Sequence, residues 1–432
     1  MGTFGCVISF QYYQCYWVRF LATVLTSSWS YKLREKVRDN RRTEENLIEI
    51  SMIEITAKLV RGPVYFSGEI IECLVTFTNP PNPIHQISQS HSDLFESLAW
   101  ASAQVHCQCS TNSKAVFSEK INTTARSVAI NANTTFAPWQ QDNGHVVLNT
   151  KPKILFCDLR LSPGENKTYI YRETIPSDAP PSYRGQAVKY SYKITIGTQR
   201  VNTAIKLLRV PFRVLSLSEL PEIMACNDSV DLSPNNPFME TQHRETPLDI
   251  ALQTLQNLTA RRSPNFYNVT NGRGRVVRFC LFKNSYKLGE DIVGTFDFSN
   301  ATVSCAQVSV SLQSEEHVSE EYRRGKATAP TLVSYNKHHE MCLGLKYSHL
   351  VLPIPLHVTP DFTTDLVTLK WRLHFEFVTT PKLVEMPNES TTSWTGPSTL
   401  DVETMIWDLP LHIHPTTTPP NTAQQTKYNI II

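Results

Sequence analysis

Two segments of the chain alternate strictly between apolar and polar positions. Residues 188–196 place Val, Tyr, Tyr, Ile and Ile on one side, and residues 369–377 place Leu, Trp, Leu, Phe and Phe on one side. A period of two marks an antiparallel β-strand with one buried and one solvent-facing side. Each segment is followed by a strand-like run with a central proline, 207–215 and 406–413. Because proline cannot donate a ladder hydrogen bond, we expect these closing strands at sheet edges or bulges.

The chain also contains an internal repeat. Residues 65–79 align without gaps on residues 286–300, an offset of 221, and six of the fifteen positions are identical. Chance would give about one identity. Each copy reads as a strand, a tight turn at Gly68 or Gly289, and a second strand. Repetition of both features predicts an all-β protein with two antiparallel β-sandwiches in tandem, joined by a linker with a short helix.

The segments between these patterns set the predicted boundaries. Residues 1–51 lack strand patterning and are interpreted as an extension outside the fold, with Met52 as a candidate alternative start. The tail contains a Thr/Pro-rich run and is expected to be disordered. The predicted parts are the first sandwich at 52–218 with polar insertions at 80–97 and 110–146, a linker at 219–265, the second sandwich at 266–414 and the tail at 415–432.

Within the linker, one segment is typical of a helix over 247–260. Thr246 can cap its start, Pro247 suits the first position, and Asp249 places an acid in the first turn. Leucines then recur at helical spacing, and two arginines follow at the carboxyl end. This apolar face fits either the chain's own sandwich or another protein. The candidate partner-binding residues are therefore Leu248, Leu252, Leu255, Arg261 and Arg262.

Charge and composition exclude several classes of function. The chain of 432 residues has 41 Lys+Arg against 39 Asp+Glu. This balance argues against duplex nucleic acid or a polybasic membrane anchor as the main partner. No run of 18 uninterrupted apolar residues occurs, so a membrane-spanning helix is not expected.

The cysteines and the amino terminus indicate the compartment. Ten cysteines contain no CxxC pair, and Cys107 and Cys109 fall on one side of a predicted strand at 99–109, so we interpret them as core residues and expect no metal. Eight N-x-S/T sequons would permit a secreted protein. However, residues 1–28 have no basic start and no clean apolar core, which a signal peptide needs. We therefore expect a cytosolic protein with reduced thiols.

Motifs of catalysis are absent from the sequence. It has no P-loop, GxSxG or HExxH motif, so no catalytic residue and no cofactor are predicted. Gly272-Arg273-Gly274 lacks a third glycine and precedes a strand, which favours a turn over a phosphate cradle. His338-His339-Glu340 is interpreted as solvated surface in a polar loop.

Two further motifs could bind partners. The basic group Arg261, Arg262, Arg273, Arg275 and Arg278 could meet an acidic partner or lipid head groups, but a solvated face is the simpler interpretation. Pro180-Pro181-Ser182-Tyr183 has the PPxY form of a WW-domain ligand. It directly precedes the alternating strand, so we interpret it as a structural turn. Together these features indicate an interaction protein.

Several blocks of the sequence resemble a known family. The two Y-x-x-G-E turns and the segment 180–195 look like the arrestin fold. Further blocks resemble the retrograde Golgi transport protein of the Rgp family, over about residues 52–414. These blocks are SLAWASAQ at 97–104, KPKILFCDLRL at 151–161, NGRGR at 271–275, LKWRLHFEFV at 369–378 and SWTGP at 393–397.

This resemblance implies a function. The family's protein is the arrestin-like, non-catalytic subunit of a two-subunit guanine-nucleotide exchange factor. Its implied partners are a larger Ric-family subunit with a β-propeller and a Rab GTPase of the Golgi, acting in endosome-to-Golgi retrograde transport. The implied location is the cytosol and, peripherally through the complex, the Golgi membrane.

Three other functions stay open at this point. An α-arrestin-type adaptor would recruit ubiquitin ligases to cargo, although such adaptors usually carry PPxY in a flexible tail and residues 423–432 contain none. A retromer-type sorting subunit would bind cargo tails without affecting GDP release. A secreted, glycosylated sandwich protein is the third alternative.

Overall fold

The computed structural model describes residues 53–81, 95–117, 144–217, 247–324, 329–381, 384, 398–416 and 427–431. The predicted extension 1–51 lies outside this part of the chain. Residues 53–432 form one compact unit. The described residues are mostly β-strand with one short helix, α4 (Pro247–Ala260), which confirms the predicted all-β class. No helix in the described part is long and apolar enough to cross a membrane.

The first sandwich consists of two sheets, in which all paired strands are antiparallel except β2 and β10. One sheet has the order β21–β1–β3–β7: β21 (Lys427–Ile431), β1 (Glu54–Leu59), β3 (Ile70–Thr78) and β7 (Asn166–Thr174). The other has the order β2–β10–β9–β4–β5, with two strands added: β2 (Val64–Phe66), β10 (Lys206–Leu215), β9 (Val188–Gln199), β4 (Glu96–Thr111), β5 (Gly144–Asn149), β6 (Lys153–Leu161) on β4 and β8 (Tyr183–Arg184) on β9.

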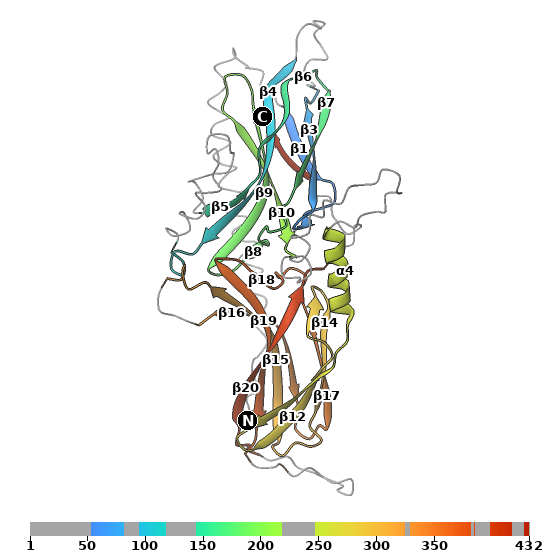
Figure 1. The fold of residues 1–432 in the computed structure, drawn as a ribbon, viewed down its shortest axis with the longest axis vertical. Coiled ribbons are helices and arrows are strands. Elements are labelled where there is room, and N and C mark those ends of the chain that lie inside the picture. Colours follow the sequence, from blue (N-terminus) through green and yellow to red (C-terminus); the bar gives the residue numbers. More distant parts are fainter. Residues whose placement is uncertain are drawn as a thin grey trace, which may run out of the picture. The chain divides into compact units, whose positions relative to one another are not determined.

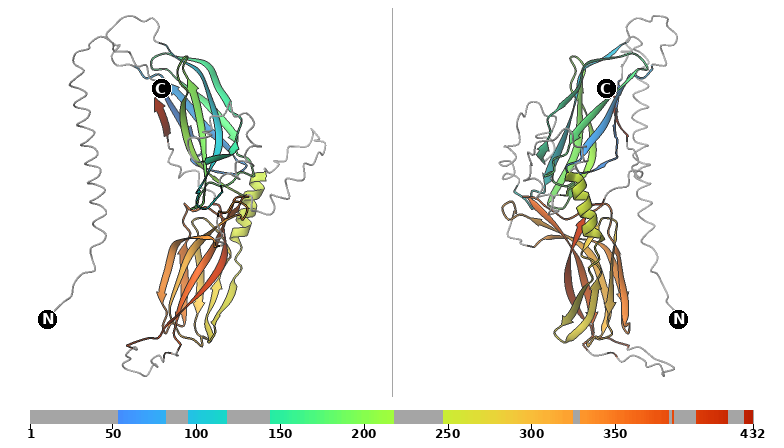
Figure 2. Two further views of the ribbon diagram at one scale, coloured as in Figure 1. Left: turned by 90° about the vertical axis from the view of Figure 1, so that its left-hand side faces the viewer. Right: turned by 45° about the vertical axis from the view of Figure 1, so that its right-hand side comes forward.

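The second sandwich repeats this plan (Figures 1 and 2). Its only parallel pair among the described strands is β13 with β20. One sheet has the order β11–β12–β14–β17: β11 (Asn265–Asn271), β12 (Gly274–Leu281), β14 (Asp291–Asp297) and β17 (Tyr347–Pro353). The other has the order β13–β20–β19–β15–β16, with β18 on β19: β13 (Ser285–Lys287), β20 (Glu403–His414), β19 (Val367–Thr379), β15 (Cys305–Val318), β16 (Thr331–Met341) and β18 (Phe362–Thr363).

The internal repeat of the sequence is one turn built twice. Gly68 and Gly289 have φ of 85° and 82°, a left-handed conformation that favours glycine. The glutamate after each glycine accepts a backbone hydrogen bond of 2.8 Å from three residues earlier, Glu69 from Phe66 and Glu290 from Lys287. The repeated Gly-Glu therefore closes the turn between β2 and β3, and again between β13 and β14, as predicted.

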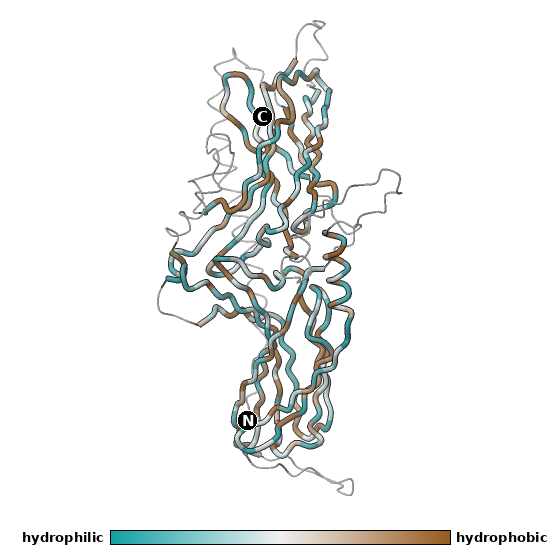
Figure 3. Tube along the Cα trace, viewed as in Figure 1, coloured by the Kyte–Doolittle hydropathy of each residue, from teal (hydrophilic) through white to brown (hydrophobic). Residues whose placement is uncertain are grey.

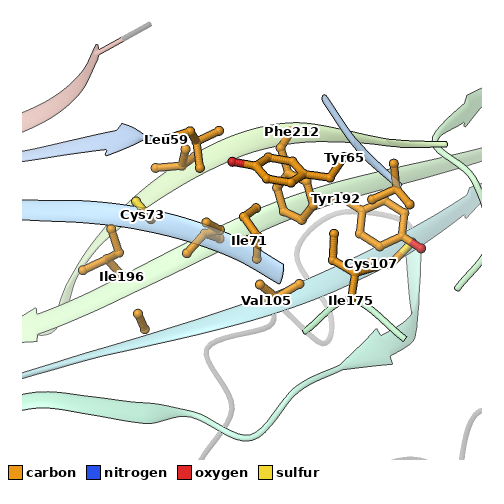
Figure 4. Close-up of a cluster of buried hydrophobic side chains, with 14 of the residues drawn as sticks. Leu59, Tyr65, Ile71, Cys73, Val105, Cys107, Ile175, Tyr192, Ile196 and Phe212 are labelled. Carbon is orange, nitrogen blue, oxygen red and sulfur yellow. The ribbon is translucent and has the colours of Figure 1, made fainter. Parts of the chain in front are cut away.

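The alternating segments form the central strands of both cores. The apolar residues of β9 and β19 are buried, and Trp371 is 1% exposed. Figure 3 shows the alternation of hydrophobic and hydrophilic residues along the strands, and Figure 4 shows the apolar side chains of the first core converging around Tyr65, Ile71 and Val105. Cys107 and Cys109 are buried in that core, as predicted.

The closing strands sit almost at their sheet edges. β10 is covered on its outer side by β2 only at Arg213–Leu215, and β20 by β13 only at His412–His414. Pro211 and Pro410 precede these short pairings and oppose Lys193 and Arg372 on their inner side. Each proline therefore lies at a position where no described strand pairs on the outer side, so the backbone N–H group that proline lacks is not required there. This agrees with the predicted edge position.

The structure corrects three predicted segments. The tail, predicted to be disordered over 415–432, ends in the strand β21, which pairs antiparallel with β1 and packs Tyr428 and Ile430 on the first core; residues 417–426 lie outside the described part. Both insertions are shorter than predicted, because 96–97 and 110–111 belong to β4 and 144–146 to β5. His338-His339-Glu340 lies in β16 and not in a loop.

Candidate partner-binding surfaces

The histidines and acid of β16 do not converge on a common point. His338 and Glu340 point to one side of the strand, and His339 points to the other, where its Nδ1 lies 3.0 Å from the Ser309 hydroxyl. Within the described ranges, no group of three or more His, Cys, Asp or Glu side chains could hold a metal ion.

The PPxY motif is built into the fold. Tyr183 is 8% exposed, and its ring packs edge-on against Phe362 with 5.0 Å between centroids. Burial raises the pKa of its hydroxyl. Ser182 exchanges two hydrogen bonds with the backbone of Val214, and the Tyr192 hydroxyl donates to the Pro180 carbonyl. The motif is a structural turn, as predicted, and does not present an accessible polyproline segment.

Tyr183 and Phe362 belong to a junction that joins the two sandwiches. Phe362, Leu366, Val367 and Leu369 of the second sandwich are buried in the core cluster of the first. On one side of the junction, the Arg213 guanidinium donates to the carbonyls of Leu356 and Val358, at 3.2 and 2.6 Å. The sandwiches therefore share apolar packing in addition to polar contacts.

The other side of the junction is held by one carboxylate. Glu316, near the end of β15, is 3% exposed. It accepts hydrogen bonds from three consecutive backbone N–H groups of the first sandwich: 2.8 Å from Gln186, 3.1 Å from Ala187 and 3.1 Å from Val188. A buried charge is tolerated when several donors satisfy it, and hydrogen bonds to an ionised group are the stronger kind.

A pocket of about 250 Å³ lies beside Glu316, and its two arginines are engaged within the chain. Arg324 donates to the Ser113 carbonyl at 2.7 Å and lies over the Phe117 ring. Arg323 donates to the Val318 carbonyl at 3.2 Å. Backbone hydrogen bonds between the two loops, from Phe117 to Tyr322 and from Arg324 to Ala115, complete this contact. Arg323 and Arg324 therefore stabilise the junction, and Lys114 is an exposed cation of the lining.

The linker helix α4 has the predicted bounds and turns its leucines toward its own chain. Leu255 is 2% exposed and forms a small cluster with Ala251 and Leu217, against which Leu248 and Leu252 are partly buried. The last turn is fixed by the Lys283 ammonium, which donates to the Thr259 carbonyl at 3.1 Å. Of the candidate partner-binding residues, the leucines thus serve internal packing first.

Arg261 and Arg262, which follow α4, are exposed, and the described residues provide no hydrogen bond or ion pair for either. The rest of the basic group is not gathered with them. Arg273 pairs with Glu403 at 2.6 Å, and the Arg278 guanidinium lies 4.4 Å from the centre of the Phe266 ring. Gly274 begins β12, and the Asn271 side chain accepts from the backbone of Arg273 and Gly274, which confirms the predicted turn there.

The chain is similar to known proteins over most of its length. The Rgp1 family profile matches residues 44–219 and 218–380, so the match begins eight residues before Met52, inside the segment interpreted as an extension outside the fold. The human (Homo sapiens) protein "RAB6A-GEF complex partner protein 2" is 46% identical over 378 residues, which cover 84% of this chain and 95% of that protein. The protein of the same name from Bos taurus is 46% identical over 373 residues, covering 83% and 93%.

Proposed function

The chain belongs to the Rgp1 family, and from that premise we propose that it is a regulatory, non-catalytic subunit of a guanine-nucleotide exchange factor complex for a Rab GTPase. The observation that carries the proposal is the 46% identity over 378 residues to a protein named as a partner in a RAB6A exchange-factor complex. At this identity and coverage the similarity extends over most of the chain and does not rest on a single motif.

Nucleotide exchange can be promoted without a catalytic group in this chain. An exchange factor binds the nucleotide-free GTPase more tightly than the GDP-bound form, and linkage then weakens GDP binding by the same factor. A GTPase that holds GDP at nanomolar affinity requires about 12 kcal/mol to be offset. This requires a large and complementary interface, above ~1,000 Å². The two sandwiches, joined by apolar packing and hydrogen bonds, provide surface for such an assembly.

The finer elements of the proposal come from the resemblance of the sequence. The partner would be a larger Ric-family subunit with a β-propeller, and the GTPase would act at the Golgi in endosome-to-Golgi retrograde transport. The complex would move between the cytosol and the Golgi membrane, to which it would bind peripherally. The exposed Arg261 and Arg262 are the part of the predicted partner-binding set that is free to contact another subunit.

Capture of partners by the full-length chain tests this assignment. We expect one large subunit at a ratio near one to one, together with nucleotide-free Rab GTPase. Charge reversal of Arg261 and Arg262 to Glu should weaken capture at least about tenfold, which corresponds to about 1.4 kcal/mol. Charge reversal of Lys151 and Lys167, which are also exposed, is the matched control and should leave capture unchanged. Equal capture by both double variants would remove Arg261 and Arg262 from the interface.

The same experiment separates the alternatives. A retromer-type subunit would bring down cargo tails and no exchange subunit. An α-arrestin-type adaptor would bring down ubiquitin ligases, but burial of Tyr183 closes its direct route through PPxY in the folded protein. Either set of partners, without a large exchange subunit, would contradict the proposal.

A further inference from the structure

Two cysteines of the second sandwich lie in contact. Cys305 begins β15, and Cys342 directly follows β16, the neighbouring antiparallel strand. The Cys342 N–H donates to the Ala306 carbonyl at 3.0 Å, so the pairing of the strands continues to this point. The two Sγ atoms are 3.3 Å apart. The side chains are 5% and 2% exposed.

The pair differs from the other cysteines in the described part of the chain. Cys107 and Cys109 lie two residues apart on one strand, where side chains are separated along the strand and do not approach as a pair across two strands do. Cys73 is buried alone in the first core, where burial raises its pKa to about 12. Cys157 is exposed and has no sulfur neighbour among the described residues.

The contact makes the two thiols differ in acidity. The Cys342 S–H group donates to the Cys305 sulfur, and this hydrogen bond lowers the pKa of Cys305. The same bond and burial raise the pKa of Cys342, which keeps its proton. Cys305 is therefore the sulfur that more readily becomes a thiolate, the nucleophilic form.

A pocket gives small molecules access to the pair. It measures about 180 Å³, and both cysteines line it together with Ser299, Ser304 and Lys346. Water occupies about 30 Å³ in the liquid, so a molecule the size of hydrogen peroxide fits such a space.

We propose that Cys305 and Cys342 form a peroxide-oxidisable dithiol that closes to an intramolecular disulfide between β15 and β16. The Cys305 thiolate attacks one oxygen of hydrogen peroxide, the O–O bond breaks, and hydroxide leaves and is protonated to water. The product is a sulfenic acid on Cys305. The Cys342 sulfur then attacks the Cys305 sulfur, the S–O bond breaks, and the Cys342 proton leaves with the hydroxyl as a second water. Two thiols lose two electrons and one peroxide gains them, and a dithiol reductant reverses the reaction.

The bridge would fix one end of an edge strand. Among the described strands, β16 pairs only with β15, and Gln307 opposite Met341 is the last pair of its ladder before the cysteines. Ser304, next to Cys305, also accepts hydrogen bonds from the Thr380 N–H through its carbonyl and from the Val384 N–H through its hydroxyl. Oxidation should therefore slow amide exchange at this end of β16 and leave β5, an edge strand of the first sandwich, unchanged.

Peptide mass spectrometry of the full-length chain tests this inference. The reduced protein is treated with hydrogen peroxide, alkylated under denaturing conditions and digested. We expect a peptide pair linked through Cys305 and Cys342 that has lost two hydrogen masses, and its disappearance after a dithiol reductant. In Cys342→Ser, Cys305 should stop at a sulfenic acid that a carbon nucleophile such as dimedone traps. Cys107→Ser is the matched control and should still form the link.

Clear outcomes would overturn it. Complete alkylation of Cys305 and Cys342 at a peroxide dose that oxidises the exposed Cys157 would show that the pair does not react. Links of Cys342 to several cysteines with equal yield would show scrambling in unfolded protein. The linked peptide is measured on the native sequence, so the inference remains testable if Cys342→Ser does not fold.

Discussion

At the scale of single residues, Glu316 is the group on which the junction depends most. Its carboxylate satisfies three backbone donors at once, and those donors belong to residues 128 to 130 positions away in the sequence. A local sequence pattern cannot reveal this role, because the hydrogen-bond partners are main-chain N–H groups, which do not depend on the residue type. The sequence around it, Ser314-Glu315-Glu316-His317, reads only as a polar end of a strand.

Replacement of Glu316 tests its contribution. Glu316→Ala removes the acceptor of three N–H groups, of which those of Ala187 and Val188 are buried, and we expect a loss of about 3–5 kcal/mol in the free energy of unfolding. Glu316→Gln keeps one acceptor oxygen and should lose about 1–2 kcal/mol. Glu320→Ala, at an exposed position four residues on, is the control and should change less than about 0.5 kcal/mol. Urea denaturation measures all three; an alanine variant as stable as the control would refute the role.

His106 gives the chain a predicted sensitivity to acid. The side chain is fully buried in β4, and burial lowers its pKa to about 4, with smaller effects from Lys193 and Arg209. The unfolded chain binds a proton on this residue near pH 6.5 and the folded chain does not, so stability falls as the pH decreases from about 6.5 to about 4. Up to about 3 kcal/mol of this loss should disappear in His106→Gln, while the partly buried His414, whose pKa is also lowered to about 4, keeps its own contribution. Unfolding curves at pH 7 and pH 4.5 measure it; an equal pH dependence in both proteins would contradict the assignment.

At the scale of elements, the strands and the helix with the strongest periodicity were predictable. β9, β19 and α4 follow from alternation or helical spacing, because each buries one face of a regular element. β21 was missed for a physical reason. Its five residues Lys427-Tyr-Asn-Ile-Ile431 do alternate, but they follow a Thr/Pro-rich run, and only the open edge of β1, distant in the sequence, makes them a strand.

The linker helix provides a matched pair of leucines. Leu255 is 2% exposed and Leu258 is 40% exposed. Leu255→Ala removes a packed side chain and should lower the free energy of unfolding by about 2–4 kcal/mol. Leu258→Ala should cost less than about 1 kcal/mol. Thermal or urea unfolding compares the two; similar losses would mean that α4 does not pack through Leu255, and that the predicted partner-binding face is free after all.

At the scale of the whole molecule, no sequence pattern indicated which residues join the two sandwiches. The apolar insertion of Phe362 and Leu366, the capture of Glu316 and the two hydrogen bonds of Arg213 act across long sequence separations. The fold class could be predicted from periodicity and repetition, and the family from blocks of residues. The contacts of the junction became visible only in the three-dimensional structure. Such a junction suits a subunit that acts by presenting surface to partners.

Release of GDP from RAB6A tests the central proposal most directly. A fluorescent GDP analogue is bound to the GTPase, and its release is followed with the larger exchange subunit alone, with this chain alone, and with both. We predict release at least about tenfold faster with both subunits than with either alone, which corresponds to about 1.4 kcal/mol of the barrier. An unchanged rate when this chain is added, in a mixture where it binds the larger subunit, would contradict the assignment.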